Sequence, residues 1–243
     1  MRVFVEKDYD ALSDRASRIL IEEIKSKKDL VLGLATGSTP IGTYERLIKA
    51  HREEGLDFSQ VKSINLDEYV GLDGNHPGSY RYFMDNVLFN HINICKSNTH
   101  VPDGTAENLE EYCKAYDSLI DKYGIDIQIL GIGSNGHIAF IEPGEELSLH
   151  TSIARLKEST INDNARFFNS REEVPDKAIS LGILSIFKAK KIILLASGKN
   201  KAFAIAKILN NDTISTKVPA SILKLHPDVT IIVDEEAYSE TKI

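Results

Sequence analysis

The sequence has no tryptophan, and only two cysteines and two methionines among its 243 residues. Cys95 and Cys113 form no C-x-x-C pair, so neither a disulfide framework nor a cysteine zinc site is expected. No apolar run reaches the roughly 18 residues that a membrane-spanning helix needs. The start of the chain turns polar at once, unlike a signal peptide. We therefore expect a cytoplasmic protein with reduced thiols and no membrane partner.

Basic residues are also in the minority, since 29 Lys and Arg stand against 36 Asp and Glu, for a formal net charge of −7. Nucleic acid is not expected as a partner, because duplex binding depends on a basic surface. A small anionic substrate remains compatible with this charge, because backbone amides and a few cations are enough to hold it.

Strand and helix patterns alternate along the chain, which predicts an α/β fold: a Rossmann-like, three-layer, doubly wound and mostly parallel sheet with helices on both faces. Hydrophobic residues make up 42% of the chain and no Pro- or Ser-rich linker divides it, so we expect a single domain over residues 1–243. The predicted strands are residues 3–6, 30–34, 61–66, 126–130, 177–181, 191–196 and 229–233. The predicted helices are residues 8–27, 40–54, 78–90, 107–123 and 199–209, with a short helical segment at 220–225 and a loop at 67–77.

The most informative stretch is residues 129–144, where a buried strand runs into three glycines and then into His137 and Glu142. In an open α/β sheet, ligands bind beyond the carboxyl ends of the strands. The glycines also match G-x-G-x-x-G, but Pro143 stops the helix that a dinucleotide site requires. The simplest alternative to a catalytic loop is a structural turn with a surface histidine.

Three further segments carry polar residues at predicted strand ends. Residues 35–40 (ATGSTP) open a helix, and free N–H groups at a helix start favour a phosphate. They do not form an ATP-binding P-loop, because Thr43 and Tyr44 stand where Lys and Ser or Thr are required. Asp67 and Glu68 follow another strand, and a carboxylate there becomes a general base if its pKa is raised. The alternatives are an ordinary helix cap and a solvated acidic pair.

Cations lie in the third of these segments and in one segment that follows no predicted strand. Lys199 and Lys201 follow the strand at 191–196, and Arg166 stands next to the aromatic residues Phe167 and Phe168. Each could hold a phosphate, although taken singly each is more simply a surface cation. Because strand-end loops of a doubly wound sheet converge on one crevice, the set together indicates proton transfer beside the carbonyl of a phosphorylated small molecule. No His/Cys cluster predicts a metal.

Five motifs, in order, resemble those of the glucosamine-6-phosphate deaminases over nearly the whole chain. They are LATGSTP at 34–40, NLDEYVGL at 65–72 with HPGSY at 76–80, GIGSNGHIAF at 131–140 with EP at 142–143, RFF at 166–168 and SGKNKA at 197–202. The resemblance implies the same type of fold and an enzyme of amino-sugar catabolism, an aldose–ketose isomerase and hydrolytic deaminase. Such an enzyme turns glucosamine 6-phosphate and water into fructose 6-phosphate and ammonia, without a metal or organic cofactor.

The resemblance also implies residue roles. His137 would move the proton that opens the pyranose ring, with Asn135 and Glu142 orienting and tuning it. Asp67 would transfer a proton between C2 and C1 through an enolamine. The phosphate would be held by Thr36, Gly37, Ser38, Thr39, Arg166 and Lys201.

This sequence departs from the family pattern at several positions. Asn135 stands where some members have Asp, and Ile141 where many have Asn. Hexameric members with an N-acetylglucosamine-6-phosphate activator site carry Arg and Lys where this chain has Ser152 and Ala154. We therefore expect no such allostery, and a monomer rather than a homo-oligomer.

Three rival functions remain open. A 6-phosphogluconolactonase has a similar fold and a related Gly-His loop, but Glu142-Pro143 and the Asp67-Glu68-Tyr69 run argue against it. A sugar-phosphate sensor would bind without turnover, although such modules usually accompany a DNA-binding domain. A dinucleotide oxidoreductase fits least well.

Overall fold

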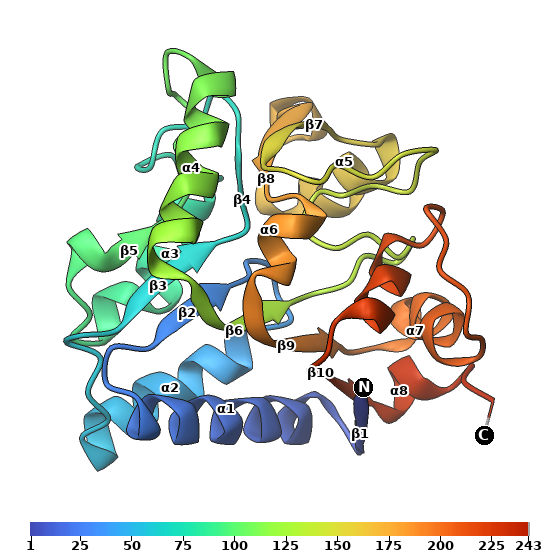
Figure 1. Ribbon diagram of the computed structural model, residues 1–243, viewed down its shortest axis with the longest axis horizontal. Coiled ribbons are helices and arrows are strands. Elements are labelled where there is room, and N and C mark those ends of the chain that lie inside the picture. Colours follow the sequence, from blue (N-terminus) through green and yellow to red (C-terminus); the bar gives the residue numbers. More distant parts are fainter. Residues whose placement is uncertain (243) are drawn as a thin grey trace.

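Seven parallel strands form the central sheet, in the order β1-β10-β9-β6-β2-β3-β5 (Figure 1). The computed structural model describes residues 1–242. Strands β2, β6 and β10 are buried along their whole length, as expected where helices cover both faces of a parallel sheet. The seven strands are β1 (Arg2–Glu6), β2 (Val31–Leu34), β3 (Lys62–Asn65), β5 (Thr99–His100), β6 (Ile125–Leu130), β9 (Ala189–Ala196) and β10 (Val229–Asp234).

Helices lie on both sides of this sheet, which confirms the predicted fold class (Figure 1). Helices α1 (Tyr9–Ser26) and α2 (Ile41–Glu54) pack together on one side. On the other side lie α4 (Leu109–Tyr123) and α6 (Ile183–Phe187). The remaining helices are α3 (Tyr80–Val87), α5 (Glu158–Asn164), α7 (Ala202–Leu209) and α8 (Glu235–Tyr238).

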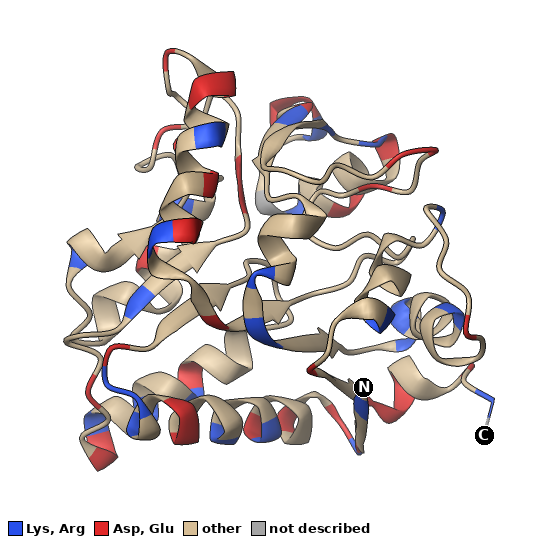
Figure 2. Cartoon of the chain, viewed as in Figure 1, with Lys and Arg blue, Asp and Glu red and all other residues tan. Residues whose placement is uncertain are grey.

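A capping residue determines where helix α1 begins. The carboxylate of Asp8 accepts the N–H of Ala11 at 2.8 Å, so it caps the helix as predicted. One face of the helix is buried, through Leu12, Ala16, Leu20 and Ile24. Lys and Arg alternate with Asp and Glu on its outer side (Figure 2), which is typical of a solvated helix face.

The prediction of a loop over residues 67–77 is wrong at its start. Asp67–Tyr69 forms strand β4, in a second, antiparallel sheet with β8 (Lys177–Ser180) and β7 (Ser152–Arg155). A strand of three residues is too short to show a periodic pattern. It is held by burial of Tyr69 among the rings of Tyr80, Phe140 and Phe168. The small sheet therefore fixes the backbone of Asp67.

Other predicted helices and strands are present, but their ends differ from the predicted ones. Residues 199–201 form a 3-10 turn before α7, and the predicted segment 220–225 is a 3-10 helix, Pro219–Leu225. Strands β5 and β7 and helices α5, α6 and α8 were not predicted, since all are short. Among residues 1–242, every helix is too short or too polar to cross a bilayer.

Candidate active site

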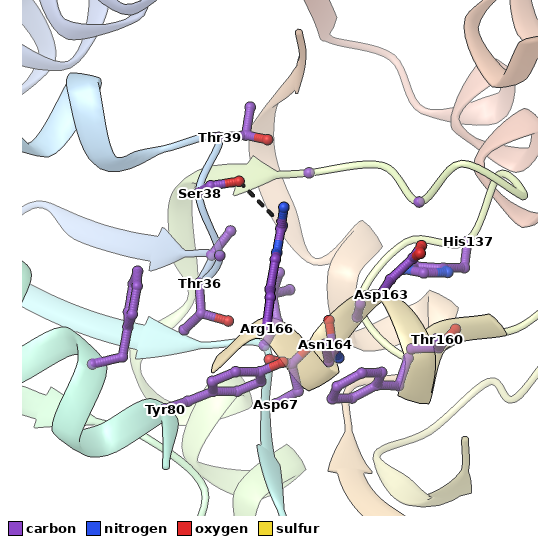
Figure 3. Close-up of a pocket in the computed structure, with 18 of the residues that line it drawn as sticks. Thr36, Ser38, Thr39, Asp67, Tyr80, His137, Thr160, Asp163, Asn164 and Arg166 are labelled. Carbon is purple, nitrogen blue, oxygen red and sulfur yellow. Dashed lines mark hydrogen bonds between the residues drawn. The ribbon is translucent and has the colours of Figure 1, made fainter. Parts of the chain in front are cut away.

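Four neighbouring strands, β9, β6, β2 and β3, end at one cavity of about 490 Å³. Chain order reverses between β6 and β2, and a doubly wound sheet opens its ligand crevice at such a point. The wall opposite the sheet comes from residues of α5 and the turn that follows it (Figure 3). The cavity is thus built from segments spread over most of the chain.

The structure brings the predicted site residues together at this cavity. Eight of the ten line it directly, namely Thr36, Gly37, Ser38, Thr39, Asp67, His137, Arg166 and Lys201. Asn135 and Glu142 lie behind His137 and contact it or each other. Lys199, the other lysine considered from the sequence, is not among the lining residues.

One end of the cavity is cationic. The loop from β2 to α2 takes a positive φ of 89° at Gly37, a conformation that favours glycine. The Arg166 guanidinium donates to Ser38 Oγ at 3.4 Å (Figure 3). Burial lowers the pKa of Lys201, against an opposing effect of Asp163. A phosphate at this end would find backbone N–H groups, hydroxyls and two cations.

His137 lies against the glycine loop that follows β6. A side chain at Gly133 would meet the imidazole at 2.3 Å, so only glycine leaves room for the ring. Burial lowers the pKa of His137, while the nearby Glu142 carboxylate acts to raise it. Because burial has the larger effect, the imidazole is neutral near pH 7. Two residues later, Ala139 takes a φ of +49°, which is uncommon outside glycine and often marks a functional turn.

Glu142 is held in place by hydrogen bonds on both oxygens. Asn135 Nδ2 donates to Glu142 Oε2 at 3.0 Å, and Thr160 Oγ1 donates to Oε1. Asn135 Oδ1 also accepts the backbone N–H of His137 at 3.1 Å. Glu142 Oε2 lies 3.7 Å from His137 Nδ1, close enough to stabilise an imidazolium by charge. Asn135 therefore orients both His137 and Glu142.

Asp67 faces the cavity from β4 with only 6% of its surface exposed. Burial, together with the charge of the adjacent Glu68, raises the pKa of Asp67 to about 8. Glu68 accepts the backbone N–H groups of Tyr69, Tyr80 and Arg81 at 2.8–2.9 Å. Those bonds favour its charged form, but burial outweighs them and raises the pKa of Glu68 to about 7. A carboxyl that titrates near neutrality is suited to proton transfer.

We expect Asp67→Asn to stabilise the fold at pH 8. The folded pKa of Asp67 is raised to about 8, so the folded chain keeps a proton that the unfolded chain releases above about pH 4. The free energy of unfolding of the wild type therefore falls as pH rises from about 4 to 8. The Asp67→Asn variant does not show this fall, because asparagine does not titrate. Urea unfolding should show a gain of at least about 2 kcal/mol at pH 8 and almost none at pH 4. An equal effect at both pH values would contradict the raised pKa.

Several lining residues were not predicted as site residues. Thr160, Asp163 and Asn164 come from α5, and Tyr80 comes from the start of α3. Helix α5 has seven residues, too few to show a hydrophobic period, and its only signal in the sequence is nearness to Arg166. Within residues 1–242 no group of three or more His, Cys, Asp or Glu side chains is arranged to hold a metal ion.

These features define an α/β enzyme with an acid–base site at the carboxyl ends of its strands. The chain belongs to the family of glucosamine-6-phosphate isomerases/6-phosphogluconolactonase, which matches residues 6–232.

The sequence relatives within this family are close in length and identity. A glucosamine-6-phosphate deaminase of Clostridium perfringens (strain 13 / Type A) is 56% identical over 238 residues, which are 98% of each chain. One of Clostridium beijerinckii is 53% identical over the whole of both chains.

Two solved structures share the fold of this chain. A monomeric glucosamine-6-phosphate deaminase superposes with a TM-score of 0.96 at 47% identity, covering 99% of this chain and 100% of that one. The 6-phosphogluconolactonase of Trypanosoma brucei has a TM-score of 0.77 at 21% identity, over 99% and 98% of the two chains. The second likeness is one of fold alone.

Proposed function

We propose that this chain is a glucosamine-6-phosphate deaminase, which converts glucosamine 6-phosphate and water to fructose 6-phosphate and ammonia. The observation that carries the proposal is the pairing of a buried Asp67 with a neutral His137 in one cavity with a cationic end. The relatives above 50% identity over the full chain length support the same substrate.

Ring opening is the first chemical step. The phosphate binds at the residue 36–39 loop with Arg166 and Lys201. The neutral imidazole of His137 then takes the proton of the C1 hydroxyl and returns it to the ring oxygen, which breaks the C1–O5 bond. Glu142 stabilises the imidazolium that exists between these transfers.

Isomerisation and deamination follow on the open chain. Asp67 removes the C2 proton while the C1 carbonyl oxygen gains a proton, which gives an enolamine. Asp67 then delivers its proton to C1 and the amine nitrogen gives up one proton, so that C1 becomes a CH₂OH group and C2 an imine. Water adds to C2 and ammonia leaves, which gives the ketone. One water enters and one ammonia departs, and the chain's own residues move only protons.

The proposal extends to the assembly and the location of the protein. We propose one domain over residues 1–243, a monomer and a cytoplasmic location. The likeness to a monomeric deaminase supports the monomer, and the free thiols of Cys95 and Cys113 support a reducing compartment. Ser152 and Ala154 support the absence of an activator site for N-acetylglucosamine 6-phosphate.

The direct test is ammonia release from glucosamine 6-phosphate by the purified chain. We expect hyperbolic saturation that N-acetylglucosamine 6-phosphate leaves unchanged, and a monomer by light scattering. Sigmoidal kinetics relieved by that sugar would reject the non-allosteric monomer while keeping the activity. Binding of the substrate without ammonia would favour a sensor.

A second candidate is a 6-phosphogluconolactonase, because the family includes both activities. Such an enzyme would hydrolyse 6-phosphogluconolactone and leave glucosamine 6-phosphate untouched. The low identity to the lactonase of Trypanosoma brucei gives it less support. The two substrates assayed side by side on one preparation separate the candidates.

A further inference from the structure

The phosphate-binding loop is anchored by a residue from another part of the chain. The Tyr9 hydroxyl, at the start of α1, accepts the backbone N–H of Gly42 at 2.8 Å. The same hydroxyl donates to the carbonyl of Ser38 at 3.1 Å. One side chain therefore joins the loop that lines the cavity to the first turn of α2.

These two bonds replace a missing helix cap. Gly42 is the second residue of α2, and its N–H would ordinarily bond to the side chain of the N-cap residue. The N-cap here is Pro40, which has no polar side chain and makes no side-chain cap bond. The neighbouring Thr43 hydroxyl is buried and makes no hydrogen bond among the described residues, and the hydroxyls of Ser38 and Thr39 line the cavity. Tyr9 caps the helix in their place.

The residues around Tyr9 allow α1 to lie close to the start of α2. A side chain at Gly42 would lie 2.5 Å from Ser13 Oγ and 3.1 Å from the Tyr9 hydroxyl, so glycine allows α1 to approach. Arg46 on α2 donates to the carboxylate of Asp10 at 2.5 Å and to its backbone carbonyl at 3.2 Å. The first turn of α1 is thus held against α2 by Tyr9 and Asp10.

We propose that Tyr9 is a positioning residue for substrate phosphate: by linking the Ser38 carbonyl to the Gly42 N–H it holds the loop of residues 36–39 in place at the bound anion. This inference rests on the proposed function for the identity of the substrate. The positioning role of Tyr9 rests only on the hydrogen bonds described above. Without the Tyr9 hydroxyl, the Gly42 N–H loses its partner and the Ser38 carbonyl keeps only the 3.4 Å bond from the Ile41 N–H. The loop that carries Ser38 and Thr39 is then held less firmly at the cavity.

The test uses inorganic phosphate as the probe, so that it does not depend on turnover. We expect Tyr9→Phe to raise the calorimetric dissociation constant of phosphate about 5-fold, the factor for one lost hydrogen bond. The KM for glucosamine 6-phosphate should rise by the same factor, with kcat changed less than about twofold. Tyr82→Phe is the matched control, because the Tyr82 ring is also part-exposed and its hydroxyl makes no hydrogen bond among residues 1–242.

A double-mutant cycle with Thr39→Ala tests the mechanism itself. Thr39→Ala should weaken phosphate binding in the wild-type background and have a smaller effect in Tyr9→Phe, where the loop no longer holds the Thr39 hydroxyl at the anion. Losses that multiply, or a phosphate affinity unchanged by Tyr9→Phe, would overturn the inference. A wild type that binds phosphate in this Tyr9-dependent way but releases no ammonia would reject the proposed function and keep the role of Tyr9.

Discussion

Replacing Asp67 with asparagine should lower kcat for ammonia release by at least about 100-fold, the usual scale for a lost acid–base group. Asn fills the same space in β4 but cannot accept the C2 proton. Burial and Glu68 raise the pKa of Asp67 to about 8, so the wild-type group is matched to proton transfer near neutral pH. The KM should change little, because the phosphate end of the cavity is untouched.

The control for this variant is Asp29→Asn, which removes the same charge from an exposed acid before β2. Its activity should equal that of the wild type. Combined with the unfolding experiment at pH 8, Asp67→Asn should be both less active and more stable, the trade-off expected if a buried carboxyl group is kept for proton transfer at a cost in stability. An Asp67→Asn enzyme that keeps more than a tenth of wild-type kcat would show that another group carries the C2 proton.

The pH dependence of the wild type follows from the same group. Asp67 must be ionised to take a proton, so kcat/KM should rise as pH increases toward about 8. A Glu68→Gln change would remove the neighbouring charge and move this rise to lower pH.

All but one of the residues predicted at the site follow strands of the central sheet, the exception being Arg166, which follows α5. The loops after β2, β6 and β9 could be found because each strand is rich in apolar residues and each loop begins with small or glycine residues. The fold class followed from the same alternation of strands and helices.

The contributions of β4, α5 and Tyr9 could not be predicted in this way. Asp67 was found as an acid after a strand, but the antiparallel sheet that buries it depends on residues 177–180, far along the chain. Helix α5 is too short for a periodic signal, so Thr160 was missed as the partner of Glu142. Tyr9 reaches Ser38 across 29 positions, a contact that only the packing of α1 on α2 creates.

The second large effect is expected for His137→Gln, which should also lower kcat at least about 100-fold. Glutamine can form hydrogen bonds but cannot shuttle a proton between the C1 hydroxyl and the ring oxygen. The burial that lowers the pKa of His137 keeps the imidazole neutral near pH 7, the form that accepts a proton. His150→Gln is the matched control, since that ring is exposed and lies outside the cavity.

An isotope measurement separates the roles of the two residues. If His137 opens the ring and Asp67 acts afterwards, His137→Gln makes ring opening slow, and C2–H cleavage no longer limits the rate. Deuterium at C2 of glucosamine 6-phosphate should therefore have almost no effect on kcat in His137→Gln, and its largest effect in Asp67→Asn. A full C2 isotope effect in His137→Gln would place His137 at the proton transfer itself, and the assignment of ring opening to the His137–Glu142 pair would fall.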